Sequence, residues 1–113
     1  MSNKIHANGI DINYEFDGPT DAPVLMLSNS LASNLHMWDA QVEALASKFR
    51  ILRADTRGHG KTEVTPPPYT VQLLLDDAIA LLDALQIQKV HFCGLSLGGM
   101  IGQRFGGFHG DRL

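Results

Sequence analysis

The sequence predicts an α/β protein in which a β-hairpin is followed by a mostly parallel sheet with helices on both faces. One observation is the order of the patterns, since short apolar runs alternate with amphipathic helical segments along the chain. The runs Val24–Leu27, Arg50–Ala54 and Val90–Cys93 form the expected parallel strands, and the apolarity of Val24–Leu27 is continuous, as in strands covered on both faces. Sheets of this kind bind ligands beyond the carboxyl ends of their strands, so we expect functional residues to follow these runs.

A hairpin is expected near the start of the chain. Asn8 and Gly9 readily adopt the two positive-φ positions of a type I′ turn. The flanking segments Ile5–Ala7 and Ile10–Phe16 carry the β-branched and aromatic residues that strands favour. These two segments therefore form the strands of the hairpin.

Apolar residues recur with the period of a helix in two segments, Trp38–Phe49 and Leu74–Leu85. Thr70 is suited to cap the second of these helices at its N-terminus. A third helix is expected from Met100 onward. Its end, Phe105–Gly110, is poor helix material because each interior glycine costs roughly 1 kcal/mol relative to alanine.

Composition and charge limit the classes of partner. The 113 residues allow one small domain, and nine Lys+Arg are scattered among twelve Asp+Glu without a basic run, which argues against a nucleic-acid or anionic-membrane surface. No apolar run approaches the roughly 18 residues of a membrane span, and the first residues lack the apolar segment of a secretory signal. The lone Cys93 permits no disulfide framework and fits a reducing compartment, so a cytoplasmic location is expected.

The segment Gly94-Leu95-Ser96-Leu97-Gly98 matches the pattern G-x-S-x-G. It lies between an expected strand and an expected helix, the context in which a serine is held on a sharp turn with its hydroxyl clear of the sheet. The flanking glycines avoid Cβ collisions, and the helix N-terminus offers free N–H groups to a developing oxyanion. We therefore interpret Ser96 as a nucleophile and the N–H of Leu97 as an oxyanion donor.

Two other interpretations of this glycine-rich turn have less support. It could be only a tight connection between a strand and a helix. A dinucleotide-binding turn requires G-x-G-x-x-G, which is not matched because Leu95 and Ser96 follow Gly94.

Four segments together carry a resemblance to a known family: Leu27–Leu31, His36–Asp39, Arg53–Gly60 and Phe92–Gly99. The chain resembles the N-terminal part of the α/β-hydrolases and, among them, the 3-oxoadipate enol-lactonases. The Asp-x-Arg-Gly-x-Gly turn and the serine motif are shared by many hydrolases. The loop that reads Ser-Asn-Ser-Leu, where most relatives have a His-Gly-type loop, resembles the enol-lactonases. The resemblance covers essentially residues 5–104.

The resemblance implies that Ser96 is the nucleophile and that the N–H of Leu97 forms half of an oxyanion hole. Leu31 matches the loop residue that supplies the other half, with Ala32 in the place of the usual glycine. In the family an acid and then a histidine follow the nucleophile along the chain. Neither has a counterpart here, so residues 1–113 are expected to be a partial α/β-hydrolase domain, truncated after the helix that follows the serine and inactive alone. No metal or organic cofactor is implied.

Structural roles are expected for the other polar candidates. Asp55 and Arg57 should hold the turn that contains them, and His59 is interpreted as a residue of this turn rather than as a substitute base. Trp38 should anchor its helix in the core. Cys93 should be a buried and inert strand residue, because no basic group adjoins it.

The remaining carboxylates and histidines show no pattern of paired acids or of metal ligands. A sheet position with satisfied hydrogen bonds is expected for His91. Solvated positions are expected for Asp76, Asp77, Asp83, His36 and His109.

The first functional hypothesis is an enzyme that opens 3-oxoadipate enol-lactone to 3-oxoadipate in aromatic-compound catabolism, through an acyl-serine on Ser96. Its partner would be a small-molecule lactone or ester, with no nucleic acid and no membrane. One alternative is a non-catalytic, truncated fragment. Another is a general carboxylesterase or a haloperoxidase-like hydrolase. The sequence gives no indication of the oligomeric state.

Overall fold

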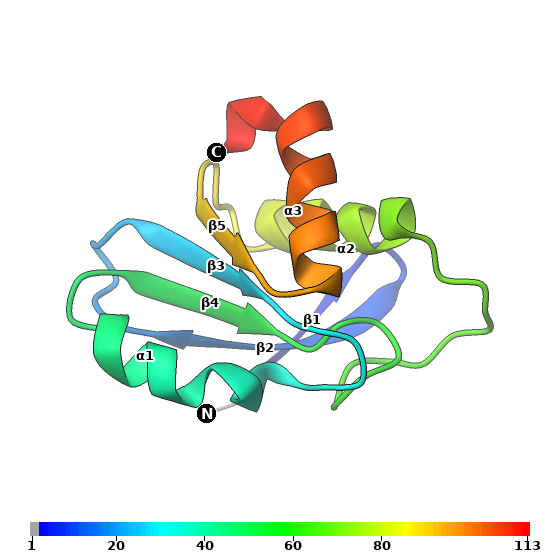
Figure 1. Cartoon of the computed structure of the whole chain (residues 1–113), viewed down its shortest axis with the longest axis horizontal. Helices are drawn as coiled ribbons and strands as arrows, with labels where there is room; N and C mark the ends of the chain where they lie inside the picture. The colour runs from blue at the N-terminus through cyan, green and yellow to red at the C-terminus, as the bar shows by residue number, and fades with distance from the viewer. Residues whose placement is uncertain (1–2) are drawn as a thin grey trace.

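A five-stranded mixed sheet is the centre of the molecule, whose computed structural model describes residues 3–113 (Figure 1). The strand order is β1-β2-β4-β3-β5. The three strands β4, β3 and β5 are parallel, and the hairpin β1–β2 joins β4 in antiparallel fashion. The strands are β1 (Asn3–Ala7), β2 (Ile10–Asp17), β3 (Val24–Ser28), β4 (Arg50–Ala54) and β5 (His91–Gly94).

The predicted hairpin is confirmed. Asn8 and Gly9 connect β1 to β2 with φ values of 50° and 79°, as a type I′ turn requires. The two strands pair in antiparallel register, with Ile5 opposite Ile12.

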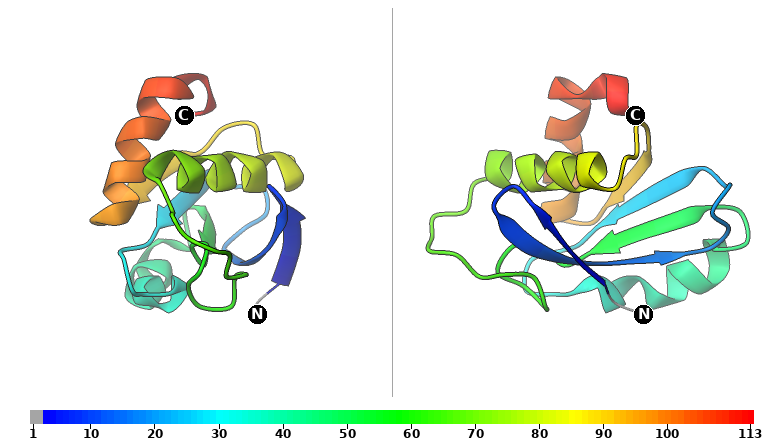
Figure 2. Two further views of the ribbon diagram at one scale, coloured as in Figure 1. Left: turned by 90° about the vertical axis from the view of Figure 1, so that its right-hand side faces the viewer. Right: turned by 180° about the vertical axis from the view of Figure 1, so that it is seen from behind.

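Helices cover both faces of the sheet, as the sequence predicted. α1 (Asp39–Leu45) lies on one face, and α2 (Val71–Ala84) and α3 (Leu97–Phe108) lie on the other, which the two views in Figure 2 show clearly. Side chains alternate between the two faces along each strand. Leu25, Leu27 and Ile51 pack with α1, whereas Met26 and Leu52 belong to the larger core beneath α2 and α3.

The first helix is shorter than the predicted segment Trp38–Phe49. A 3₁₀ turn over Leu35–Trp38 precedes α1, and α1 ends at Leu45. The chain must reverse before β4, because the N–H of Arg50 already donates to the carbonyl of Pro23 at 2.9 Å. The N–H groups of residues 48 and 49 both donate to the carbonyl of Leu45, which closes the helix into that turn.

The third helix extends further toward the C-terminus than predicted. α3 begins at Leu97, within one turn of the predicted start, and continues to Phe108 through the glycines at 106 and 107. The cause is tertiary packing, because Phe105 is fully buried with its ring centroid 5.3 Å from that of Phe92. Burial of this side chain offsets a cost of roughly 1 kcal/mol for each helical glycine. The cap predicted for α2 is confirmed, since Thr70 Oγ1 accepts a hydrogen bond from Leu73 N–H at 3.0 Å.

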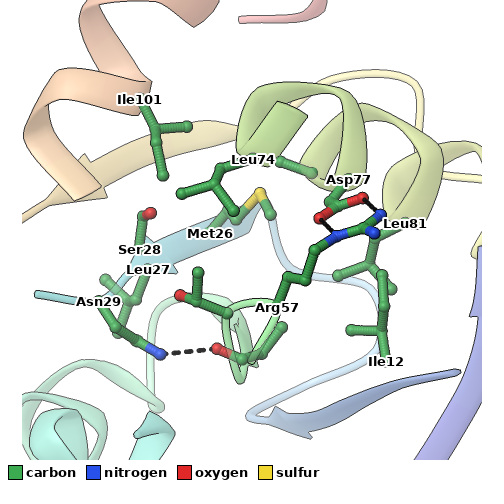
Figure 3. A pocket seen from close by; sticks show the side chains of 13 residues that line it. Ile12, Met26, Leu27, Ser28, Asn29, Arg57, Leu74, Asp77, Leu81 and Ile101 are labelled. Atoms are coloured by element: carbon green, nitrogen blue, oxygen red, sulfur yellow. Dashed lines mark hydrogen bonds and ion pairs between the residues drawn. The ribbon is translucent and has the colours of Figure 1, made fainter. Parts of the chain in front are cut away.

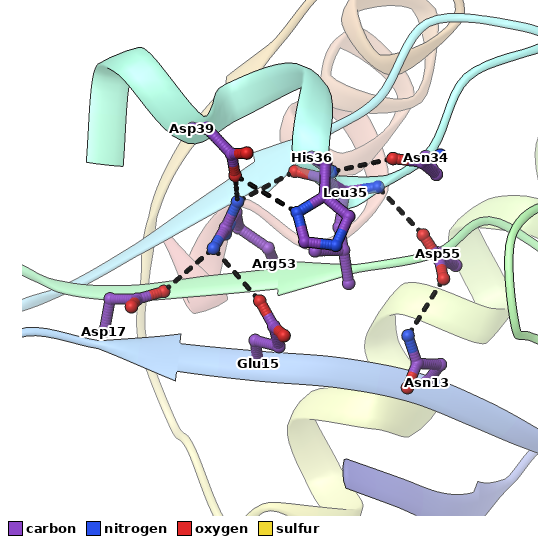
Figure 4. A network of polar contacts seen from close by, with 9 residues as sticks. All are labelled: Asn13, Glu15, Asp17, Asn34, Leu35, His36, Asp39, Arg53 and Asp55. Atoms are coloured by element: carbon purple, nitrogen blue, oxygen red, sulfur yellow. Dashed lines mark hydrogen bonds and ion pairs between the residues drawn. The ribbon is translucent and has the colours of Figure 1, made fainter. Parts of the chain in front are cut away.

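A buried arginine joins β2, β4 and α1 (Figure 4). Arg53 is only 5% exposed. Its guanidinium donates to the carbonyl of Leu35 at 3.0 Å and to the carboxylates of Asp39, Glu15 and Asp17 at 2.7, 3.0 and 3.2 Å. The hydrogen bond from Arg53 holds the pKa of Asp39 below its ordinary value.

Replacement of Asp39 by Asn is expected to lower the free energy of unfolding at pH 7 and to lower it by less as the pH falls below the ordinary pKa of the carboxyl. Because the folded state depresses the pKa of Asp39, the carboxylate stabilises the fold above its unfolded pKa of about 4, and this contribution is lost as the pH falls through the lower, folded value. Urea unfolding of both proteins across this range measures the difference. A difference that stays constant with pH would contradict the assignment.

Candidate active site

Ser96 lies on a sharp turn between the end of β5 at Gly94 and the start of α3 at Leu97. Its backbone has φ 56° and ψ −111°, a sparsely populated region that costs about 1–3 kcal/mol for a residue with a side chain. The predicted turn geometry is therefore confirmed. The side chain of Ser96 is exposed, and within residues 3–113 the N–H of Leu97 has no hydrogen-bond acceptor.

Two glycines permit this turn because neighbouring backbone approaches them closely. A Cβ added to Gly94 would lie 2.2 Å from the carbonyl oxygen of Gly98, and a Cβ added to Gly98 would lie 2.1 Å from the carbonyl oxygen of Ser28. Ser28 ends β3 and is paired with Gly94 across the sheet. The motif thus presses the start of α3 against the carboxyl end of β3.

Replacement of Gly98 by Ala is expected to destabilise the protein by roughly 1–3 kcal/mol, because the added methyl must displace the backbone of β3. Gly99→Ala is a matched control, since its Cβ would meet only ordinary van der Waals contacts, of which the nearest is 3.6 Å. That variant should be neutral or more stable by up to about 1 kcal/mol. Thermal and urea unfolding of the pair test this, and equal stability of the two variants would contradict the packing argument.

The loop after β3 is fixed to the rest of the fold by Asn29. This side chain is buried, and its Nδ2 donates to the carbonyl of Ala54 at the end of β4 at 2.8 Å. Its Oδ1 accepts from Trp38 Nε1, also at 2.8 Å. Trp38 is buried in the core beneath α1, so its predicted anchoring role is confirmed, and its indole also orients this loop.

The candidate oxyanion donor of this loop is the backbone of Leu31, whose side chain is exposed. The preceding N–H, of Ser30, donates to Met37 Sδ at 3.3 Å, and the following N–H, of Ala32, donates to His59 Nε2 at 3.1 Å. The N–H of Leu31 itself has no acceptor within the described residues. Because Leu95 N–H donates to the carbonyl of Ser28 at 3.2 Å, the start of this loop is tied directly to the turn that carries Ser96.

Asp55 holds the turn after β4, as predicted (Figure 4). The carboxylate is buried and accepts hydrogen bonds from Leu35 N–H, Asn13 Nδ2 and Lys61 N–H at 2.8–2.9 Å. A Cβ on Gly60 would collide with this carboxylate at 2.3 Å. The residue therefore organises backbone and does not face the site.

Arg57 also holds its turn, through an ion pair with Asp77, for which a solvated position is predicted from the sequence. Asp77 is only 7% exposed, and its carboxylate receives Arg57 Nε at 2.8 Å and the terminal nitrogen at 2.7 Å. The prediction of a solvated Asp77 was therefore wrong. Its hydrogen bonds raise the pKa of Arg57, and Asn8 Nδ2 adds a third contact to Asp77 at 2.8 Å.

This ion pair lines a small cavity of about 50 Å³ between the sheet, α2 and α3 (Figure 3). Ser28 and Asn29 contribute the polar part of its wall near the carboxyl end of β3, and Met26, Leu74 and Ile101 contribute apolar parts. The cavity has room for a water molecule or two rather than for a substrate.

The described histidines do not approach Ser96 within hydrogen-bond distance. His59 is occupied by Ala32 N–H and by the carbonyl of Arg57. His36 is exposed and contacts Asp39, as expected for a solvated ring. His91 is exposed beside Phe49, and His109 is half-buried against Phe105, so the prediction of a solvated His109 was wrong.

Cys93 is exposed, which corrects the prediction of a buried thiol. β5 forms an edge of the described sheet, and Cys93 points to the same face as Leu27, its partner in β3. That face is covered by α1, which packs on β3 and β4 and not on β5.

Among the described residues, no group of three or more His, Cys, Asp or Glu side chains is arranged to hold a metal ion. Within the same residues, no helix has the length and apolar character needed to span a membrane.

A family model of the alpha/beta hydrolase fold matches residues 23–113. The chain belongs to this family. In alpha/beta hydrolases the nucleophile occupies a strand-to-helix turn of the kind seen at Ser96. The fold class predicted from the sequence is thereby confirmed.

The most similar proteins include enol-lactonases. The chain is 44% identical over 97 residues to 3-oxoadipate enol-lactonase 2 of Acinetobacter baylyi, covering 86% of this chain and 36% of that protein. It is 40% identical over 95 residues to the putative carbamate hydrolase RutD of Agrobacterium fabrum, a match that covers 80% of this chain and 36% of that protein. The crystal structure of the enol-lactonase from Burkholderia xenovorans LB400 superposes with a TM-score of 0.96 at 44% identity, over 98% of this chain and 44% of that one.

These matches confirm the resemblance to 3-oxoadipate enol-lactonases that the sequence indicated. The chain spans about a third of the length of the curated relatives it matches. It therefore presents one part of an alpha/beta hydrolase, the part that contains the serine turn and the loop after β3.

Proposed function

We propose that this chain provides the nucleophile and the oxyanion hole of a serine hydrolase of the 3-oxoadipate enol-lactonase type. The observation that carries the proposal is the strained, exposed Ser96 at the start of α3, tied to a loop in which the Leu31 N–H has no acceptor among residues 3–113. The N–H groups of Leu97 and Leu31 are the two proposed donors. Similarity to enol-lactonases supports a lactone as the substrate.

In the proposed reaction Ser96 Oγ attacks the carbonyl carbon of the lactone while a base removes its proton. Negative charge develops on the carbonyl oxygen, where the N–H groups of Leu97 and Leu31 would stabilise it. Collapse breaks the bond to the ring oxygen, and the released enol takes the ketone form. Water then attacks the acyl-serine, which frees the carboxylic acid and restores Ser96. The base is proposed to lie outside residues 3–113, because no histidine within them contacts Ser96.

A carbamate is the second candidate substrate, favoured by the 40% identity to a putative carbamate hydrolase. A general carboxylesterase remains a third. Both share the acyl-serine chemistry of Ser96 and differ only in the bond that is cleaved. The substrate is therefore tested by comparing turnover rather than by changing the nucleophile.

The test is a hybrid enzyme in which this chain replaces the matching segment of 3-oxoadipate enol-lactonase 2 of Acinetobacter baylyi. If the proposal is correct, the hybrid opens enol-lactone with a kcat/KM at least about 10²-fold above its value for a simple aryl ester or carbamate, a difference of roughly 2.7 kcal/mol in transition-state stabilisation. An inactive but folded hybrid would overturn the proposal. Comparable rates on all three substrates would overturn the assignment to a lactone.

A further inference from the structure

A side chain from a distant loop holds the peptide that follows the candidate oxyanion donor. Ala32 has φ 59°, a backbone conformation that residues with a side chain rarely adopt without support. Its N–H donates to His59 Nε2 at 3.1 Å, across 27 residues of sequence. On the other side of Leu31, Met37 Sδ accepts the N–H of Ser30. Of these three consecutive N–H groups, the central one, of Leu31, is the one without an acceptor in the part of the chain that the structure describes.

The contacts of His59 define one tautomer. Its Nδ1 lies 3.1 Å from the carbonyl oxygen of Arg57, which can only accept, so Nδ1 carries the proton. The N–H of Ala32 can only donate, so Nε2 presents its lone pair. Because the Nε and Nη2 edge of the Arg57 guanidinium is bound by both carboxylate oxygens of the buried Asp77 of α2, the residue whose carbonyl orients the ring is held by a rigid element of the fold.

We propose that His59 is a positioning residue of the oxyanion hole: its Nε2 fixes the peptide of Ala32 so that the N–H of Leu31 points to the reacting oxygen. The inference rests on the proposed function, which gives the Leu31 N–H its role. His59 itself touches neither substrate nor Ser96. His59 acts by fixing the direction of the Leu31 N–H, because an oxyanion donor stabilises a transition state only when it is held in place before the reaction.

Two substitutions separate the acceptor from the shape of the ring. His59→Gln keeps an acceptor, since its Oε1 can reach the place of Nε2, whereas His59→Phe keeps a planar ring and removes the acceptor. In the 113-residue chain, ¹⁵N NMR should show a protonated Nδ1 and an unprotonated Nε2 for His59. The Ala32 amide should be protected from hydrogen exchange in the parent and in His59→Gln, and should lose that protection in His59→Phe.

Kinetics in the hybrid enzyme supply the functional readout. For His59→Phe we expect kcat to fall roughly 10–100-fold with KM changed less than about threefold, because only an interaction made in the transition state is weakened. His59→Gln should stay within about threefold of the parent. His6→Gln is the control, since this exposed histidine lies on β1 and contacts only Asp11 within the described residues.

Each result either supports or overturns the positioning role of His59. If His59→Phe keeps the parent kcat, or if His59→Gln is as impaired as His59→Phe, the inference is overturned while the proposed function stands. The same holds if the NMR spectrum shows the opposite tautomer. An inactive parent hybrid instead overturns the proposed function, and the inference with it.

Discussion

The 113-residue chain by itself is expected to open 3-oxoadipate enol-lactone no faster than its Ser96→Ala variant. A serine hydroxyl is a weak nucleophile at neutral pH unless a base removes its proton. Within residues 3–113 no side chain hydrogen-bonds Ser96 Oγ, and both ring nitrogens of the turn residue His59 are already occupied. The geometry of the turn at Ser96 alone therefore does not make the serine reactive.

The size of the effect follows from serine hydrolases in general. Loss of one triad member leaves roughly 10³–10⁴-fold acceleration over water, supplied by the oxyanion hole and substrate binding. Within residues 3–113 no acidic or basic side chain hydrogen-bonds Ser96 Oγ, so we expect turnover to remain well below about 1 s⁻¹. Purified chain is assayed beside Ser96→Ala. Turnover above about 1 s⁻¹ that disappears in the variant would show that this chain alone is a complete catalyst.

In the hybrid enzyme, unlike in the 113-residue chain alone, we expect replacement of Ser96 to have a large effect on activity. There Ser96→Ala should lower kcat by about 10⁶-fold, the scale on which loss of a serine nucleophile acts. Ser47→Ala is the control, because this exposed serine lies in the turn after α1 and away from the carboxyl edge of the sheet. A hybrid that keeps more than a hundredth of its activity without Ser96 would exclude the acyl-serine mechanism.

The features that could be predicted from the sequence are those that local chemistry decides. Asn8 and Gly9 adopt positive φ because few other pairs do so at low cost, and the turn at Ser96 follows from glycines that must admit backbone within about 2 Å of a Cβ position. The hairpin turn and the turn at Ser96 could therefore both be located in the sequence without knowledge of the sheet. The length of α3 could not, because the burial of Phe105 decides it.

The solvated position predicted for Asp77 was wrong, although the spacing of this residue along α2 pointed to the buried face of the helix. Leu74, Asp77 and Leu81 occupy positions i, i+3 and i+7, so the period that predicted the buried face of α2 also placed this carboxylate on it. A charged side chain predicts exposure to solvent, whereas Asp77 is buried. The buried Arg57 that it pairs with lies 20 residues earlier, and only the folded chain brings the two together.

The exposure of Cys93 and the contact of His59 with Ala32 depend on tertiary structure alone. The side chains of β5 alternate between the two faces of the sheet, but which of these faces a helix covers is decided by where α1 packs. The two loops that His59 joins follow different strands, β3 and β4, and meet only because those strands are parallel neighbours. Residue types in either loop taken separately carry no signal for that contact.

Removal of the carboxylate of Asp77 is expected to destabilise the fold by about 3–5 kcal/mol. Asp77→Ala would leave Arg57, only 8% exposed, without its two charge-assisted hydrogen bonds inside the protein. It would also remove the contact by which Asn8 ties the hairpin turn to α2. The free energy of unfolding in urea measures the loss.

Two further variants identify the cause of that loss. Asp76→Ala changes the adjacent, exposed carboxylate of α2 and should alter stability by less than about 0.5 kcal/mol. The double variant Asp77→Leu with Arg57→Met removes both charges and keeps most of the volume, so it should recover much of the stability, because the main penalty of Asp77→Ala is an unpaired buried cation. If the double variant is as unstable as Asp77→Ala, the loss comes from packing around α2 and the hairpin turn. If Asp77→Ala is no less stable than Asp76→Ala, the pair lacks the structural role assigned to it.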